Sequence, residues 1–178
     1  HAVADIGDEA VKFMTEDGHE KVEKYLEDME RTLAENGMPA ECMTEYFMYP
    51  MIKHGEYESK TALLHGTGTT TDMYEYSEGT PPQNSGEIAI TTILAKKLKA
   101  AVGDTVTVSY PTGERSEYII TALYQAMVNQ GTSVRVHNDC DINYLSAVGS
   151  PGTLIKFTDD PDDKEVLRRI EKIKELYP

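Results

Sequence analysis

The chain has 178 residues, of which 31 are acidic and 17 basic, and its formal net charge is −14. Nucleic-acid binding depends on clustered lysine and arginine that neutralise phosphates, so this balance argues against a DNA or RNA partner. Hydrophobic residues make up 39% of the chain, enough for a folded core, while no apolar run approaches the ~20 residues that cross a bilayer. Residues 1–80 hold 18 acidic and 6 basic side chains, and therefore most of the acidic excess.

Residues 17–35 are predicted to form an amphipathic helix. The apolar side chains that recur at helical spacing are Val22, Tyr25, Leu26, Met29 and Leu33. Asp17 and Glu20 have the spacing of a capping box at its start. The Asn-Gly pair at 36–37 is typical of a left-handed helix stop.

Two strands, at residues 41–49 and 56–65, follow this helix. They are expected to pair as a hairpin through a turn at 50–55. Residues 66–86 then collect glycine, threonine, proline and serine, a composition typical of a connector between subdomains.

Tyr74 and Tyr76, in this connector, are the candidate residues for a partner surface. An aromatic ring with a polar tip suits such a surface. The other tyrosines near the hairpin lie on predicted strands, where half-buried packing explains them.

The middle of the chain, residues 81–131, is predicted to be a small β-rich unit. The expected elements are a strand at 87–90, a helix capped by Thr91 or Thr92 that buries Leu94 and Leu98, and strands at 105–110 and 117–124 joined by a turn at 111–114. Alternation of apolar and polar residues along the last two strands indicates a mostly antiparallel, barrel-like arrangement.

The end of the chain contains two more strands and a helix. The strands are expected at 132–136 and 153–157, and the helix is expected to begin with Asp160 as its cap and Pro161 in its first turn. The apolar stripe of this helix contains Val166, Leu167, Ile170, Ile173 and Tyr177.

The predicted fold class is α+β. A discontinuous helix-plus-sheet subdomain is built from both ends of the chain, residues 1–80 and 132–178. The β-rich unit at 81–131 is inserted into it.

The sequence predicts no catalytic, cofactor-binding or metal-binding residue. His137 and Cys140 lie three residues apart and suggest a thiol nucleophile, but such pairs are usually brought together by the fold. A calcium loop beginning at Asp139 would need glycine where Tyr144 stands and glutamate where Ser150 stands. The acidic residues near the start of the last helix favour its macrodipole and need no metal.

Residues 87–131 contain an ordered set of features that is more specific than a generic small barrel. The two segments concerned read GEIAITTILAKKLKAAVGDTVTVSY and YIITALYQAMVNQG. In order they contain a short strand at 87–90, an A-x-x-L helix with Ala95 and Leu98, a Gly-Asp turn within 102–106, a strand at 120–124 and an N-x-G end at 129–131. This order resembles the extracytoplasmic domain of MacB/FtsX-type ABC transporter permeases.

The resemblance implies an ectodomain that does no chemistry and needs no cofactor. Its implied partners are a cytoplasmic ATPase reached through membrane helices, a second permease copy, and a peptide, lipoprotein or envelope protein as substrate. The implied location is the cell membrane, with this domain exposed on the extracytoplasmic side. Both ends of the chain are then expected at one end of an elongated molecule.

An extracytoplasmic location also motivates the hypothesis of a disulfide between Cys42 and Cys140. Two alternatives to the transporter interpretation stay open at this point. One is a secreted thiol-dependent hydrolase that uses Cys140 and His137, and the other is a free-standing extracellular ligand-binding or adhesion module.

Overall fold

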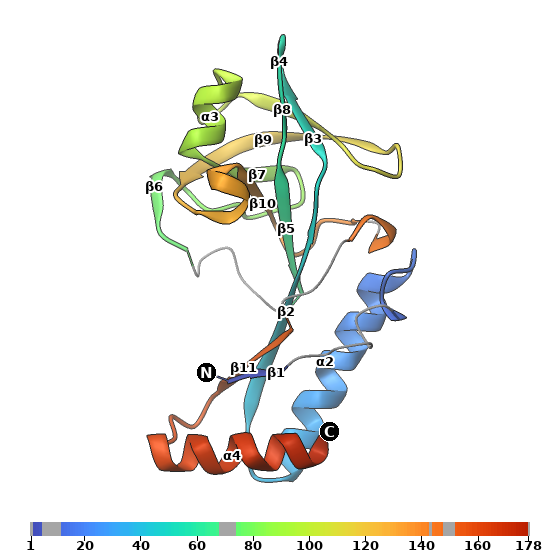
Figure 1. The fold of residues 1–178 in the computed structure, drawn as a ribbon, viewed down its shortest axis with the longest axis vertical. Helices are drawn as coiled ribbons and strands as arrows, with labels where there is room; N and C mark the ends of the chain where they lie inside the picture. Colours follow the sequence, from blue (N-terminus) through green and yellow to red (C-terminus); the bar gives the residue numbers. More distant parts are fainter. Residues whose placement is uncertain (1, 5–11, 68–73, 143, 148–151, 178) are drawn as a thin grey trace.

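The computed structural model describes residues 2–4, 12–67, 74–142, 144–147 and 152–177 (Figure 1). The helices are α2 (Gly18–Glu35), α3 (Thr92–Leu98) and α4 (Asp163–Leu176). The strands are β1 (Ala2–Ala4), β2 (Ala40–Met48), β3 (Met51–His54), β4 (Tyr57–Lys60), β5 (Ala62–Thr67), β6 (Tyr76–Gly79), β7 (Glu87–Thr91), β8 (Thr105–Ser109), β9 (Arg115–Tyr124), β10 (Ser133–Val136) and β11 (Thr153–Phe157). Two short 3-10 turns are η2 (Val128–Gly131) and η3 (Tyr144–Ser146).

The described strands belong to one mixed sheet. Its order is β1-β11-β2-β5-β10-β7-β9-β8-β3-β4, and β6 pairs with β9 outside this path. The predicted α+β class is confirmed, but the sheet is open where a barrel-like unit was expected. The reason is that the β3–β4 hairpin pairs with β8, at the edge where a strand closing a barrel would have to lie.

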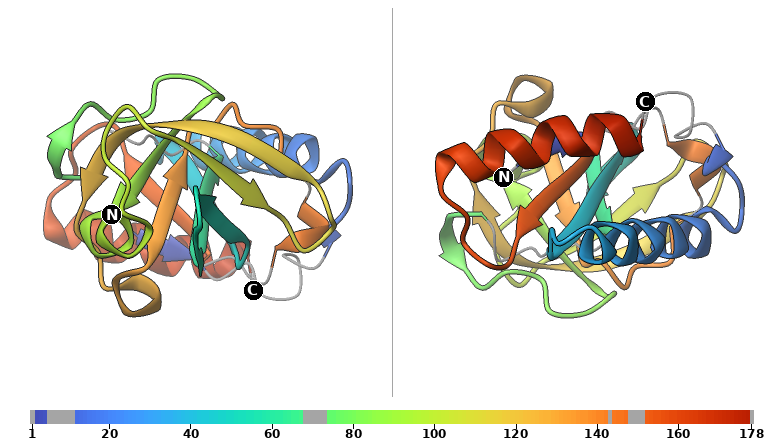
Figure 2. Two further views of the ribbon diagram at one scale, coloured as in Figure 1. Left: turned by 90° about the horizontal axis from the view of Figure 1, so that it is seen from above. Right: turned by 90° about the horizontal axis from the view of Figure 1, so that it is seen from below.

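Figure 1 shows an elongated molecule with β1 and α4 at one end and α3 and the β3–β4 hairpin at the other. The elements nearest to the two chain ends therefore lie at the same end, as the resemblance implied. The two views of Figure 2 look onto these opposite ends. Because β3 pairs with β8 and β6 pairs with β9, hydrogen bonds cross the boundary expected near residue 80, and the division into subdomains stays a prediction.

The predicted first helix is present as α2. Its buried face contains Val22, Leu26, Met29 and Leu33. The capping box is absent, because the Asp17 carboxylate instead accepts a hydrogen bond from Thr15 and pairs with Lys21 at 2.8 Å. The helix ends as predicted: Gly37 has a φ of +72°, and the N–H groups of residues 37 and 38 bond to the carbonyls of residues 34 and 33, as in a Schellman motif.

The predicted hairpin is longer than expected. β2 pairs with β5, and beyond Pro50 the ribbon continues as the β3–β4 pair, with Thr61 donating its N–H to the Pro50 carbonyl at 3.1 Å. The chain reverses at Gly55, which has a φ of +56°, rather than across residues 50–55.

One core cluster contains buried side chains of both α2 and α3.

The middle unit contains the elements expected from its sequence. Thr91 caps α3 by accepting the N–H of Leu94, and Leu94 and Leu98 are buried. β8 and β9 form the predicted antiparallel hairpin.

The last helix begins later than predicted. Asp162 is the cap and accepts the Glu165 N–H at 2.8 Å, whereas Asp160 has a φ of +48° and cannot supply the extended backbone that a cap requires. Ile173 is buried, but Leu167 is 64% exposed and lies outside the apolar stripe.

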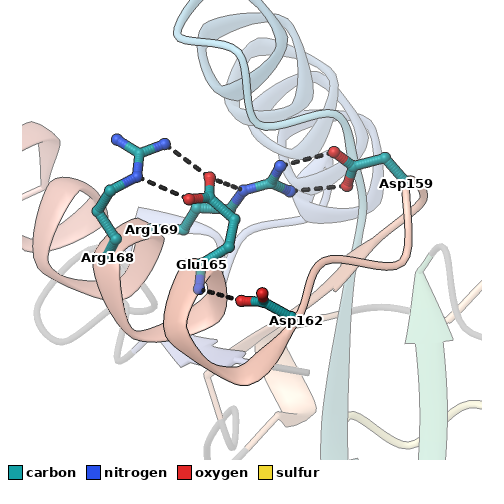
Figure 3. Close-up of polar contacts among 5 residues, drawn as sticks. All are labelled: Asp159, Asp162, Glu165, Arg168 and Arg169. Carbon is teal, nitrogen blue, oxygen red and sulfur yellow. Dashed lines mark hydrogen bonds and ion pairs between the residues drawn. The ribbon is translucent and has the colours of Figure 1, made fainter.

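Charged side chains anchor the start of α4 (Figure 3). Arg169 donates two hydrogen bonds to Asp159, at 2.6 and 2.7 Å, and a third to Glu165 at 2.9 Å. Its guanidinium also lies 4.9 Å from the centre of the Phe157 ring. Hydrogen bonds from Arg168 and Arg169 lower the pKa of Glu165 to about 2, so this carboxylate stays ionised. The acidic residues near this helix start therefore serve as cap and ion-pair partners.

Candidate functional site

Tyr74, one of the two predicted partner-surface residues, lies against a buried arginine. The Arg135 guanidinium stacks on the Tyr74 ring at 3.9 Å and donates a hydrogen bond to the Tyr74 hydroxyl at 2.9 Å. Both terminal nitrogens of Arg135 also donate to Glu45 Oε1, one of them at 2.7 Å. The Tyr74 hydroxyl in turn donates to Glu45 at 3.1 Å. We call these three side chains the Arg135 cluster.

The strand register explains how Arg135 reaches Glu45 across a strand. β5 lies between β2 and β10, and Glu45 stands opposite Gly66 of β5. Arg135 stands opposite Leu64, two residues from Gly66, and therefore projects from the same face. Because Gly66 carries no side chain, the guanidinium can lie over β5 and meet the carboxylate.

Burial determines the electrostatics of this cluster. The Arg135 side chain is 3% exposed and that of Glu45 is 17% exposed. Burial lowers the pKa of Arg135 to about 10, so the guanidinium is still a cation at neutral pH and needs the carboxylate beside it. Burial also raises the pKa of Tyr74, which keeps its hydroxyl protonated as a donor. The cluster can therefore hold the segment before β6 onto the sheet.

Tyr76 belongs to the same group of aromatic rings. Tyr74 and Tyr76 both contact Tyr124 edge-on, with ring centres 6.4 and 6.2 Å apart. The Tyr124 hydroxyl is hydrogen-bonded to Ser133 at 2.9 Å. Tyr74 keeps 38% of its surface exposed. The use of Tyr74 and Tyr76 as a partner surface stays a prediction.

A second buried cluster brings together residues that are isolated in sequence. The His65 ring is hydrogen-bonded to the Tyr144 hydroxyl at 3.0 Å and to the Asn138 carbonyl at 2.9 Å. His19, from α2, contacts the His65 ring edge-on at 5.4 Å, and Tyr46 stacks on Tyr144 at 4.5 Å. Burial lowers the pKa of His65 to about 4, so its imidazole is neutral at neutral pH. The cluster joins α2 to the sheet and to η3.

The two cysteines do not form the predicted disulfide. Both are buried free thiols: Cys42 lies on β2, where its N–H donates to Glu30 of α2, whereas Cys140 lies in the loop after β10 and its sulfur donates to the Ser85 carbonyl at 3.2 Å. Burial raises their pKa values, to about 12 for Cys42 and about 11 for Cys140.

In the described part of the chain, the His137 imidazole is not hydrogen-bonded to the Cys140 sulfur. His137 Nδ1 accepts the Asp139 backbone N–H at 3.2 Å and lies 3.4 Å from the Asp139 carboxylate. Cys140 is joined to His137 through the backbone, because the Cys140 N–H donates to the His137 carbonyl at 3.0 Å. A neutral, buried thiol is a poor nucleophile, so the hydrolase hypothesis loses the pair on which it rested.

Within the described ranges, no group of three or more histidine, cysteine or carboxylate side chains is arranged to hold a metal ion. The histidine pair formed by His19 and His65 could not be found from spacing, because the two come from elements far apart in the chain. Arg135 did carry a signal, as a single charge between Val134 and Val136 in an apolar strand.

No protein-family model and no curated protein matches the sequence. Solved structures do match. The periplasmic region of MacB from Actinobacillus actinomycetemcomitans aligns with a TM-score of 0.56 and 13% identity, over 83% of this chain and 72% of that one. The extracellular domain of the noncanonic ABC-type transporter YknZ from Gram-positive bacteria aligns with a TM-score of 0.54 and 12% identity, over 80% and 75%.

This chain has the fold of a MacB-like extracytoplasmic permease domain. The resemblance seen in residues 87–131 thus extends, at the level of the fold, over most of the chain. None of the helices in the described part is both long and apolar enough to span a membrane.

Proposed function

We propose that this chain is the extracytoplasmic domain of an ABC transporter permease and that it does no chemistry itself. The observation that carries this proposal is the MacB-like fold. The placement of β1 and α4 at one end of the elongated molecule agrees with it, because a domain attached to two membrane helices needs both of its ends on the membrane side.

The domain then couples ATP hydrolysis on a cytoplasmic subunit to the handling of an extracytoplasmic substrate or partner. A second permease copy completes the transporter, and the substrate class is a peptide, a lipoprotein or an envelope protein. Because one hydrogen-bonded sheet runs from β1 to β4, a displacement at the membrane end moves the far end as a rigid body. The Arg135 cluster supports this by holding β2 and β10 together across β5.

The test is cysteine accessibility in the full-length permease, expressed in cells together with its ATPase. Glu58→Cys places a thiol on exposed β4, whereas the native Cys42 and Cys140 are buried and serve as internal controls. We expect a membrane-impermeant maleimide to label position 58 in intact cells, mapped by mass spectrometry. Labelling that appears only after the cells are permeabilised contradicts the proposal.

A second test reads the coding sequence beyond both ends of these residues. Apolar segments of about 20 residues at both borders are expected for a permease. If both borders lack such a segment, the free-standing binding module becomes the better interpretation.

A further inference from the structure

The end of the molecule farthest from β1 and α4 carries a group of lysines, together with the exposed Glu56 and Glu58 of the β3–β4 hairpin. Five lysines lie on or beside β3, β4 and α3, namely Lys53, Lys60, Lys96, Lys97 and Lys99. Within the described residues, none of them has a carboxylate within 4 Å, whereas Lys156, Lys172, Lys174 and both arginines of α4 are paired. Lysines grouped at one end of a chain of net charge −14 favour an acidic partner. The grouping carries this argument, because the exposed Lys24 and Lys164 are unpaired elsewhere on the described surface.

Two of these lysines face a hollow of about 380 Å³. Its lining residues are Tyr49, Lys60, Lys97, Asn129, Gln130 and Thr132. None of these residues is acidic, and the Lys60 ammonium lies 5.6 Å from the centre of the Tyr49 ring. A carboxylate entering this hollow would meet two ammonium groups and an aromatic wall.

A second hollow, of about 370 Å³, shares the turn that contains η2 with the first, because Gly131 lines the second hollow and Asn129 and Gln130 line the first. Its lining residues are Thr91, Thr92, Ile93, Gln125, Ala126, Met127 and Gly131. Met127 is 86% exposed and Ile93 is 45% exposed, and both of these apolar side chains line this one hollow. This hollow suits an apolar side chain.

The turn that lines both hollows has a strained backbone. Asn129, Gln130 and Gly131 all have left-handed backbones, with φ of 48°, 56° and 80°. The Thr91 hydroxyl donates to the Gly131 carbonyl at 2.5 Å, and the Asn129 side chain donates to the Thr132 hydroxyl at 2.8 Å. A left-handed backbone at residues other than glycine is costly and persists where the surroundings enforce it, often at binding sites.

We propose that the two hollows form one docking surface for a protein segment that presents a carboxylate next to an aliphatic or aromatic side chain. The carboxylate lies between Lys60 and Lys97, and the apolar side chain lies against Ile93 and Met127. This inference rests on the proposed function and names the chemistry of the substrate or partner. A protein segment is favoured over a lipid surface because α3 and β4, which contribute lining residues to these hollows, lie at the end opposite to β1 and α4, where the proposed function places the membrane (Figure 1).

The test is fluorescence anisotropy with a short fluorescein-labelled peptide in which glutamate and leucine alternate. We expect it to bind, and Lys60→Gln/Lys97→Gln to weaken the binding about tenfold, since each partly exposed charge contact contributes a factor of about three. The matched control is Lys24→Gln/Lys164→Gln, which removes two exposed, unpaired lysines elsewhere on the described surface and leaves binding unchanged. Met127→Ser is expected to weaken binding severalfold.

Three outcomes would overturn the proposal. They are no binding of the peptide, equal weakening by both lysine pairs, and binding that persists when glutamine replaces glutamate in the peptide. A parallel experiment measures binding to vesicles of phosphatidylglycerol. If the vesicles bind through Lys60 and Lys97 and the peptide does not bind, the surface belongs to a lipid. Failure here leaves the maleimide result at position 58 unaffected, so the two proposals fail separately.

Discussion

Replacing Glu45 by glutamine tests the energetics of the Arg135 cluster. Glutamine keeps the size of the side chain but removes the charge, and so leaves the Arg135 guanidinium, only 3% exposed, without a counter-ion. Breaking a buried ion pair by removing one partner costs about 3–5 kcal/mol. Because Glu45 itself is 17% exposed, we expect a cost at the lower end of this range, a fall of about 3 kcal/mol in the free energy of unfolding.

The measurement is urea unfolding followed by far-ultraviolet circular dichroism. In a thermal melt of the same variants, a loss of about 3 kcal/mol corresponds to a fall in Tm of about 6–12 °C for a chain of this size. The matched control is Glu41→Gln on the same strand and the same face, whose partner Lys156 lies 3.4 Å away. Both side chains of that control pair are at least half exposed, so its loss is expected to stay below about 1 kcal/mol.

A double-mutant cycle gives the decisive comparison. Glu45→Leu combined with Arg135→Met removes both charges, and we expect the double variant to be less destabilised than the sum of the two single variants by about 2 kcal/mol. If Glu45→Gln costs no more than Glu41→Gln, or if the cycle is additive, the buried guanidinium does not depend on Glu45 and the reasoning is wrong.

Three further predictions concern the histidine, a glycine and the thiols. Burial lowers the pKa of His65 from 6.5 to about 4, so between these pH values the unfolded state binds more protons and stability falls as the pH falls. Between pH 6.5 and 5 the wild-type chain should lose about 1.5 kcal/mol more than His65→Gln. His54→Gln, which retains the buried imidazole, is the control, and equal slopes for His65→Gln and wild type would contradict this prediction. A Cβ at position 18 would lie 2.0 Å from a backbone oxygen and 2.8 Å from the Tyr144 ring. Gly18→Ala should therefore lower the free energy of unfolding in urea by about 1–3 kcal/mol. Gly86→Ala is the control and should change it little, because the atom nearest to a Cβ there lies at 3.4 Å. Both buried thiols should react with Ellman's reagent only in denaturant, and rapid reaction of the folded chain would refute their burial.

Local patterns in the sequence predicted the regular elements well. The helical spacing of apolar residues identified α2, and alternation identified β8 and β9, because each pattern needs only one face to be apolar. The helix stop at Gly37 was also correct, since a left-handed backbone is a local property of glycine. The caps were less well predicted: Asp17, Asp160 and Asp162 all suit a cap by composition, and the path of the chain decides among them.

Composition and local patterns predicted the α+β class, the order of elements in the middle of the chain and the concentration of acidic residues in its first 80 positions. The sequence also carried enough of an ordered pattern for the resemblance to a MacB-like domain. All of these depend on residues close together in the chain, or on composition.

The contacts between side chains far apart in the chain depend on the folded arrangement of the strands. The Arg135 cluster depends on β5 lying between β2 and β10 with Gly66 at the crossing, and the pairing of His65 with Tyr144 depends on how η3 returns to the sheet. The same packing left both thiols free and placed Lys60 and Lys97 beside the turn that contains η2. Such contacts follow from strand order and register, which local periodicity does not encode.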